Sequence, residues 1–260
     1  MIAGIVTALR TLTIFPVPGR DADDMADSLP WFAVVGCILG FIVYGLCRLT
    51  GFVGAGAWPE GVAVVALVAG TVLTGGLHLD GLADWADGFG STSDRHRTLQ
   101  IMKDPHVGAF GVLALVVVLI AKWVALTRLA AAGGLVWIAA AYIVSRTSMV
   151  ELAGWLPYAR PEEGIGASFV QNAGRRHRFW ALFSALALLL VIYGPAGALL
   201  FGVGWITSRL FGLWCRRRVG GVTGDLLGAC SEIVETVILA VCAAVPGRLV
   251  EFADWSLLLS

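Results

Sequence analysis

The sequence has 260 residues, of which 58% are hydrophobic and only 14% are charged. Soluble domains contain about 25% charged residues, so this composition excludes an ordinary soluble domain and indicates an integral membrane protein. The formal net charge is zero, which argues against a nucleic-acid partner. The five cysteines form no C-x-x-C pair, so neither a disulfide framework nor a structural zinc site is expected.

Long uncharged segments alternate with short polar segments along the chain. Residues 2–15 are apolar but too few to cross a bilayer, which takes about 20 residues, so we expect them at the interface or against the bundle. Gly194-Pro195 divides the long uncharged segment after Arg178 into two helices. The sequence therefore predicts an all-α polytopic bundle, one membrane-embedded domain over residues 1–260 with about seven spans. The expected spans cover residues 31–47, 61–77, 107–126, 133–156, 179–193, 196–214 and 226–245.

The basic residues predict the orientation of these spans. With a cytoplasmic N-terminus, 12 of the 18 lysine and arginine residues fall in cytoplasmic loops, three fall outside and three lie within spans. Such an excess is typical of cytoplasmic loops. We therefore expect a multi-pass protein of the cytoplasmic membrane whose functional loops face the cytoplasm. In an alternative arrangement, residues 179–214 form one helix and a re-entrant segment. The functional loops would still lie together on the cytoplasmic side.

Three carboxylates, Asp80, Asp84 and Asp87, follow one another at spacings i, i+4 and i+7. On an α-helix they fall within a sector of ~60° and form one acidic stripe. Oxygen ligands suit Mg²⁺ or Mn²⁺, and Mg²⁺ typically takes one or two carboxylates together with substrate phosphates. The stripe therefore indicates either a divalent-cation site or a solvated acidic helix face at the membrane edge.

A second acidic group, Asp225, Glu232 and Glu235, lies on a related face of the last expected span. Ionisable groups inside a span are costly unless they are paired or hydrated, and they commonly mark a functional interior. These carboxylates could bind a cation or a substrate. Alternatively, they could pair with Lys122 or Arg146 and hold the bundle together.

Two further segments could bind phosphate. Gly220, Gly221 and Gly224 precede a helix, and their backbone N–H groups could approach a phosphate at its N-terminus. Lys103 could bind a phosphate as a point charge, although an interfacial lysine explains it equally well. The chain has no H-E-x-x-H, Gly-x-Ser-x-Gly or Walker A pattern, so a zinc hydrolase, a serine hydrolase and a P-loop enzyme are not supported.

Several segments, in the same order along the chain, resemble the signature segments of the cobalamin synthase family, adenosylcobinamide-GDP ribazoletransferases. They are His-Leu-Asp-Gly-Leu-Ala-Asp-x-Ala-Asp-Gly at 78–88, Met-Lys-Asp at 102–104 with Gly-Ala-Phe-Gly at 108–111, and Gly-Gly-x-Thr-Gly-Asp-x-x-Gly-Ala at 220–229. Ser145-Arg146, Leu-Pro-Tyr-Ala-Arg-Pro at 156–161 and Pro16-Val17-Pro18 are also similar. The resemblance covers nearly the whole chain.

The resemblance implies a Mg²⁺-dependent enzyme of the bacterial inner membrane that assembles the nucleotide loop of cobalamin. Such an enzyme joins adenosylcobinamide-GDP to α-ribazole, or to α-ribazole 5′-phosphate, and releases GMP. A ribose hydroxyl attacks the cobinamide-side phosphorus and gives adenosylcobalamin or its 5′-phosphate. The implied partners are the two substrates, the lipid bilayer, other enzymes of the corrinoid pathway and further copies of the chain.

Together with the residue patterns, this resemblance implies roles for individual side chains. The expected metal ligands are Asp80, Asp84, Asp87, Asp225 and Glu232, with Mg²⁺ as the ion and Mn²⁺ as an alternative. The expected catalytic residues are Asp84, Asp87 and Lys103, and Asp87 is the first candidate for the base. The expected phosphate contacts are Arg95, Lys103, Arg146, Gly220, Gly221 and Gly224.

Two other functions are open at this point. Asp84-x-x-Asp87-Gly88 matches the opening of the CDP-alcohol phosphotransferase pattern, but the downstream Ala-Arg and paired aspartates of that pattern do not follow. An ion-coupled transporter could use the charges within the spans, but we find no repeat of the kind that transporters often contain. Those charges are Lys122, Arg146, Glu151, Glu232 and Glu235.

Overall fold

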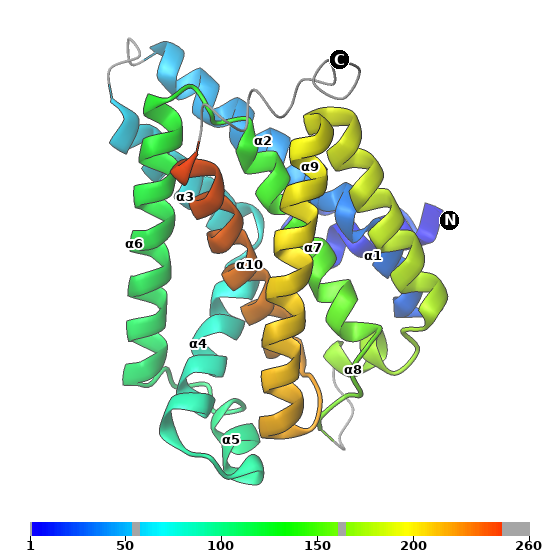
Figure 1. The fold of residues 1–260 in the computed structure, drawn as a ribbon. Coiled ribbons are helices and arrows are strands. Elements are labelled where there is room, and N and C mark those ends of the chain that lie inside the picture. The colour runs from blue at the N-terminus through cyan, green and yellow to red at the C-terminus, as the bar shows by residue number, and fades with distance from the viewer. Residues whose placement is uncertain (1, 54–57, 161–164, 246–260) are drawn as a thin grey trace.

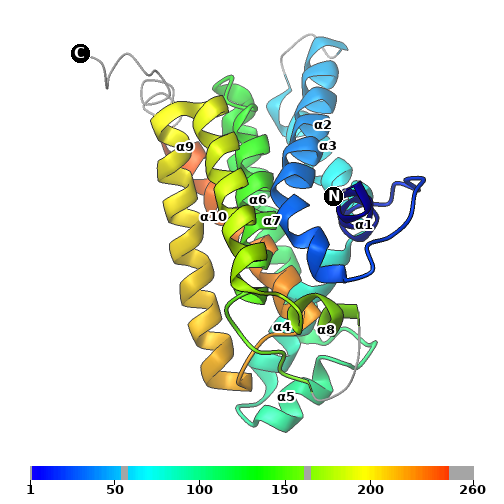
Figure 2. The same cartoon turned by 90° about the vertical axis from the view of Figure 1, so that its right-hand side faces the viewer.

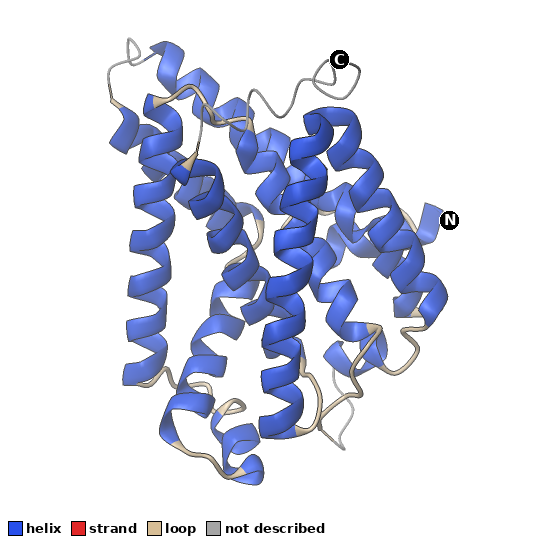
Figure 3. Cartoon of the chain, viewed as in Figure 1, coloured by secondary structure: helices blue, strands red, loops and turns tan. Residues whose placement is uncertain are grey.

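A computed structural model describes residues 2–53, 58–160 and 165–245. These residues form helices and no strand (Figure 3). The helices are α1 (Ile2–Leu12), the 3₁₀-helix η1 (Met25–Trp31), α2 (Phe32–Val53), α3 (Pro59–Leu73), α4 (Leu77–Ser91), α5 (Arg95–Ile101), α6 (Ala109–Ala131), α7 (Trp137–Ala153), α8 (Ile165–Val170), α9 (Arg175–Val219) and α10 (Gly224–Ala244). The prediction of an all-α polytopic membrane protein is confirmed.

Helix α7 is the centre of the bundle, and every one of its 17 residues is buried. It packs against α2, α9 and α10 (Figures 1 and 2). Gly36 and Gly40 of α2 face α7, and a Cβ at Gly36 would lie 2.6 Å from the carbonyl oxygen of Tyr142. Small residues four apart let two helix backbones approach closely, as is common between helices in membranes.

The structure does not confirm the count of seven spans. By length and composition, four of the described helical segments could cross a membrane, or five if the bent pair α3 and α4 forms one broken span. The predicted span 61–77 ends early at Leu73, because Gly75 and Gly76 adopt positive φ values of 61° and 71°. Helix α4 therefore leaves α3 at 90° instead of continuing it. The predicted span 133–156 is the shorter helix α7.

The predicted break at Gly194-Pro195 is confirmed. Gly194 has φ 55° and ψ −145°, values that no α-helix contains, and the two arms of α9 run antiparallel to each other in Figure 1.

The segments predicted as polar loops differ from the prediction, because they contain the short helices α5 and α8. Helix α9 also continues to Val219, and Arg218 donates hydrogen bonds to the carbonyl oxygens of Phe89 and Thr92 at the end of α4.

Candidate active site

Helices α4 and α10 cross where each has a glycine. A Cβ at Gly81 would lie 2.6 Å from the carbonyl oxygen of Asp225, and one at Gly228 would lie 3.3 Å from the Cα atom of His78. Only glycine allows so close an approach without a shift of the backbone. The crossing therefore brings the acidic stripe of α4 to the first turn of α10, which carries Asp225.

A short backbone pairing places an arginine beside Asp225. The N–H of Val222 donates to the carbonyl oxygen of Pro157 at 2.9 Å, and the N–H of Ala159 donates to that of Val222 at 2.8 Å. The next residue, Arg160, donates from Nη2 to Oδ2 of Asp225 at 2.8 Å and to the carbonyl oxygen of Met102 at 3.3 Å. The segment 157–160 thus joins the two motif segments that begin at Met102 and Gly220.

A cavity of about 310 Å³ lies beside this junction, and we call it the substrate cavity. Its charged end is formed by Asp80, Arg160 and Asp225. The rest of its wall is mainly apolar; the apolar side chains are Leu29, Phe32, Leu77, Met149, Phe169 and Leu227. The polar side chains Thr11 of α1, His78 of α4 and Tyr158 also line it. A mostly apolar cavity with a few convergent polar groups is typical of a small-molecule site.

The carboxylates near the charged end are electrostatically unbalanced. Asp84 is half-buried, and Asp225, Asp80 and Asp87 all place negative charge near it, which Arg160 offsets only in part. Among the described residues, no three histidine, cysteine or carboxylate side chains are close enough together to hold a metal ion by themselves. The donor chemistry nevertheless fits Mg²⁺, which needs only one or two carboxylates when substrate phosphates complete its coordination.

Asp87 has a structural role that the sequence pattern did not reveal. Its two carboxylate oxygens accept hydrogen bonds from the N–H groups of Gly108, at 2.7 Å, and Gly111, at 2.9 Å. These donors lie at the start of α6, where backbone N–H groups have no partner within the helix. A Cβ at either glycine would collide with the carboxylate. Asp87 therefore caps α6 and does not line the substrate cavity.

The predicted phosphate contacts divide into two sets. Arg95, Gly220 and Gly221 lie together: Arg95 donates from Nη2 to the carbonyl oxygen of Ala159 at 3.3 Å, and its guanidinium group lies against Gly220. Gly220 has a φ of 79° and ends α9. Gly224 lines the substrate cavity. Lys103 is exposed and directly follows Met102, whose carbonyl oxygen binds Arg160. Gly224 alone of these residues lines the cavity, whereas Arg95 and Lys103 lie next to the contacts made by Ala159 and Arg160.

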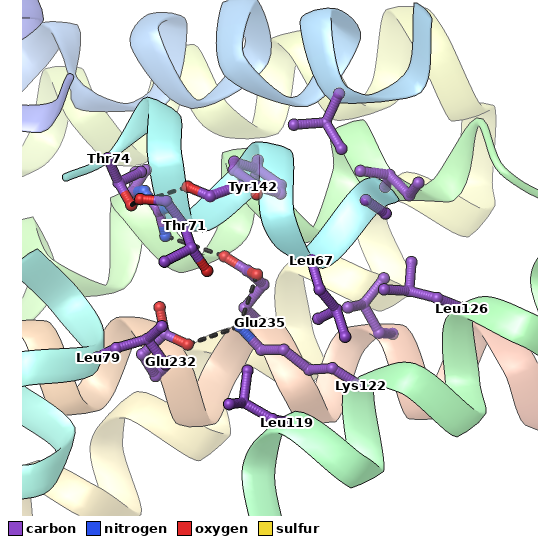
Figure 4. A pocket seen from close by; sticks show the side chains of 16 residues that line it. Leu67, Thr71, Thr74, Leu79, Leu119, Lys122, Leu126, Tyr142, Glu232 and Glu235 are labelled. Atoms are coloured by element: carbon purple, nitrogen blue, oxygen red, sulfur yellow. Dashed lines mark hydrogen bonds and ion pairs between the residues drawn. The ribbon is translucent and has the colours of Figure 1, made fainter. Parts of the chain in front are cut away.

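Arg146 and Glu232 lie elsewhere, in a buried ion cluster with Lys122 and Glu235. Figure 4 shows Lys122, Glu232 and Glu235 of this cluster. Lys122 Nζ lies 2.6 Å from Glu232 Oε2 and 2.7 Å from Glu235 Oε1, and Arg146 Nη1 lies 3.1 Å from Glu235 Oε2. None of these side chains is more than 7% exposed. Neither Arg146 nor Glu232 lines the substrate cavity, so the structure does not bring them together with the predicted site residues there. The alternative, pairing within the bundle, is what the structure contains.

The site also includes a residue to which sequence reasoning gave no role, Arg160. Its segment, 156–161, was noted only for its similarity to the family. The composition of a polar loop does not indicate which arginine will reach a carboxylate 65 residues away. The available signal was the segment itself, in which a proline and an aromatic residue precede an arginine in an otherwise polar connection.

Comparison with known proteins identifies the family of the chain. The family described as cobalamin-5-phosphate synthase matches residues 4–243. The chain is 49% identical over 254 residues to the adenosylcobinamide-GDP ribazoletransferase of Chlorobaculum parvum, with 94% of this chain and 96% of the relative covered. The enzyme of the same name from Syntrophobacter fumaroxidans is 42% identical, with 91% and 96% covered. No solved structure matches the chain. The chain belongs to the cobalamin-5-phosphate synthase family.

Proposed function

We propose that this chain is an adenosylcobinamide-GDP ribazoletransferase that joins the cobinamide nucleotide to α-ribazole, or to its 5′-phosphate, with release of GMP. The observation that carries the proposal is the substrate cavity, in which an apolar wall leads to a charged end formed by Asp80, Arg160 and Asp225. Such a cavity can bind an organic alcohol and a pyrophosphate side by side. The family and its named relatives support the same reaction.

The reaction requires a ribose hydroxyl to attack the cobinamide-side phosphorus. A bond forms between the hydroxyl oxygen and that phosphorus, the bond to the bridging oxygen breaks, and GMP leaves with both electrons. Asp80, the exposed carboxylate at the charged end, accepts the hydroxyl proton. Arg160 binds the pyrophosphate and offsets its charge, with Arg95 and Lys103 nearby. Catalysis of this kind depends mainly on positioning and charge neutralisation.

Asp84 and Asp225 would hold Mg²⁺ at this end of the cavity. When bound, the ion supplies the positive charge that the pyrophosphate and the leaving GMP require. Asp87 has a different part in this scheme from the one predicted for it. Since it caps α6, it fixes the position of α4 and thereby of Asp84.

The first test is an assay of the detergent-purified protein with adenosylcobinamide-GDP, α-ribazole and Mg²⁺. We expect equal amounts of GMP and cobalamin, loss of both with a chelator, and recovery when Mg²⁺ is restored. Asp84→Asn should lower turnover at least about 10³-fold without changing the elution volume of the protein, since it removes a charge at the reacting centre. Folded wild-type protein that makes no product from either form of α-ribazole would contradict the proposal.

A transporter is the second candidate, and the same preparation tests it. The charges that such a path would use are engaged in ion pairs: those of the buried ion cluster, and Glu151 with Arg178 and Arg209. This arrangement favours a fixed bundle. Substrate uptake into proteoliposomes without chemical conversion would support the transporter and oppose the transferase.

We also propose that the charged end of the cavity faces the cytoplasm, as the positive-inside excess of the loops predicts. His106 lies in the loop between α5 and α6, and its side chain is 89% exposed. A His106→Cys variant should therefore react with a membrane-impermeant maleimide in inverted membrane vesicles but not in intact cells. The reverse pattern would contradict this orientation.

A further inference from the structure

The substrate cavity has three charged side chains, Asp80, Arg160 and Asp225, and a mainly apolar remainder, which we call its apolar depth. This contrast indicates which part of which substrate the cavity takes. We propose that the apolar depth of the cavity binds the benzimidazole base of α-ribazole. The ribose hydroxyl then points to the charged end formed by Asp80, Arg160 and Asp225. This inference rests on the proposed function and adds the site of the acceptor substrate to it.

The size of the cavity restricts its occupant. Small-molecule sites span roughly 300–1,000 Å³, and this cavity, at about 310 Å³, lies at the lower limit. It has room for one nucleoside. A corrin ring system is far larger than a nucleoside, so the cobinamide part of the other substrate must lie outside this cavity.

The wall of the cavity selects among nucleosides. Phe32 and Phe169 pack edge to face, with ring centroids 6.1 Å apart, and Leu29, Met149 and Leu227 also contribute to the wall. Guanine carries several hydrogen-bond donors and acceptors, and this wall would leave most of them unpaired at considerable cost. The base of α-ribazole has two methyl groups and one free ring nitrogen. The apolar wall therefore fits the base of α-ribazole and not that of GDP.

One buried polar side chain in this wall has no partner. His78 is only 1% exposed, and neither of its ring nitrogens makes a hydrogen bond within the described part of the chain. Buried polar groups are nearly always hydrogen-bonded, so an unpaired one in the wall of a cavity indicates a missing ligand atom. A hydrogen bond donated by one ring N–H of the imidazole to the free ring nitrogen of the base would give a partner to each of these two nitrogens.

The test narrows the apolar depth and follows each substrate separately. Met149→Phe enlarges a side chain of the wall, and the two methyl groups of the base should then fit less well. We expect kcat/KM for α-ribazole to fall about tenfold, mainly through KM, because a pocket discriminates single methyl or methylene groups by about this factor. The loss should be smaller for the riboside of unmethylated benzimidazole. KM for adenosylcobinamide-GDP should stay within twofold of the wild-type value.

Two further variants make the test specific. Val117→Phe enlarges a side chain in a different apolar cavity, of about 410 Å³ between α4, α6, α9 and α10, and should leave both KM values unchanged. His78→Asn should raise KM for α-ribazole about tenfold. It should raise KM for the riboside of unmethylated benzimidazole by the same factor, because His78 is proposed to contact the ring nitrogen and not the methyl groups. Leu227→Phe replaces Met149→Phe if the latter does not elute as folded protein.

The outcomes separate this inference from the proposed function. Wild-type protein without turnover would contradict the function, and equilibrium binding of labelled α-ribazole to it would still test the cavity. If wild-type protein turns over, a higher KM for adenosylcobinamide-GDP in Met149→Phe would overturn the inference and assign the cavity to the guanosine. Unchanged KM values for both substrates in Met149→Phe and Leu227→Phe would overturn it as well.

Discussion

The buried ion cluster and the charged end of the substrate cavity contain the same kinds of residue, but they differ in charge balance and in solvent exposure. In the cluster, Lys122 and Arg146 face Glu232 and Glu235, and no side chain is more than 7% exposed. At the cavity, one arginine, Arg160, pairs with one of several neighbouring aspartates. Asp225 is 25% exposed in its side chain, and Asp80 is exposed.

This difference distinguishes structure from function in the same bundle. The two cations and two carboxylates of the cluster pair with one another inside a membrane protein and hold helices α6, α7 and α10 together. An excess of carboxylates around an accessible cavity remains unstable until cations or donors arrive with a ligand. The comparison therefore predicts that variants of the cluster lower stability, whereas variants of the cavity lower turnover.

The largest expected effect on stability is that of Lys122→Met. The change removes the cation that binds both Glu232 and Glu235 and leaves a buried carboxylate without a partner. Breaking a buried pair in this way costs about 3–5 kcal/mol. Thermal unfolding of the detergent-purified variant should show this loss. The double variant Lys122→Met, Glu232→Gln removes one charge of each sign and should recover most of it. A double variant no more stable than Lys122→Met would contradict the pairing.

The next effect is that of Arg160→Ala on turnover. The variant removes the arginine that pairs with Asp225 and offsets the negative charge at the cavity. We expect turnover to fall about 10- to 100-fold, as when one charged contact to a reacting phosphate is lost. Arg160→Lys should recover only part of the rate, since an ammonium group cannot bind two acceptors in a plane. Thermal unfolding serves as the control, and a variant with normal turnover would exclude Arg160 from the site.

A smaller effect is expected at the cap of α6. Gly108→Ala places a Cβ against the carboxylate of Asp87 and disrupts the hydrogen bond from residue 108. Loss of a helix cap typically costs about 0.5–2 kcal/mol. The melting temperature should fall accordingly, and turnover should fall with it because α4 shifts. Gly202→Ala is the matched control, since a Cβ there has no neighbour within 4 Å. Equal melting temperatures for the two variants would contradict the cap.

The smallest effect concerns Asp104, which lies outside the spans. Hydrogen bonds from the N–H and the ring of His106 hold the pKa of this carboxyl below its usual range. Since the pKa is lower in the folded state, the stabilising contribution is present above the ordinary aspartate pKa and is lost as pH falls toward the lowered value. Asp104→Asn should therefore lower the melting temperature slightly at neutral pH and leave it unchanged in strong acid. A difference that grows with acidity would contradict this account.

The sequence predicted those features that depend on local order. Apolar segments and the Gly194-Pro195 break gave the helices of the bundle, and the spacing of Asp80, Asp84 and Asp87 placed them on one helix. The acidic stripe itself did not reveal that Asp87 faces the start of α6 while Asp80 faces the cavity. That division depends on where α6 and α10 pack against α4, which periodicity along one helix cannot show.

Contacts between distant segments account for what the sequence could not show. Asp225 and Glu232 are on the same helix and were predicted to act together. In the structure, Asp225 lies in the first turn of α10 and pairs with Arg160, whereas Glu232 lies about two turns further along α10 and pairs with Lys122 of α6. The pairing of residues 157–159 with Val222 was equally hidden, because it joins two loops through backbone groups that carry no sequence signal.

The most direct measurement of the difference between the two groups compares Asp225→Asn with Glu232→Gln. Both changes replace a carboxylate of α10 by its amide, one at the cavity and one in the cluster. Turnover should be measured per molecule of folded protein, with thermal unfolding of the same samples. We expect Asp225→Asn to lose at least about 100-fold in turnover with a near-normal melting temperature. Glu232→Gln should have a lower melting temperature but the same turnover per folded molecule as the wild-type protein. Normal turnover in folded Asp225→Asn, together with loss of turnover in folded Glu232→Gln, would contradict the account.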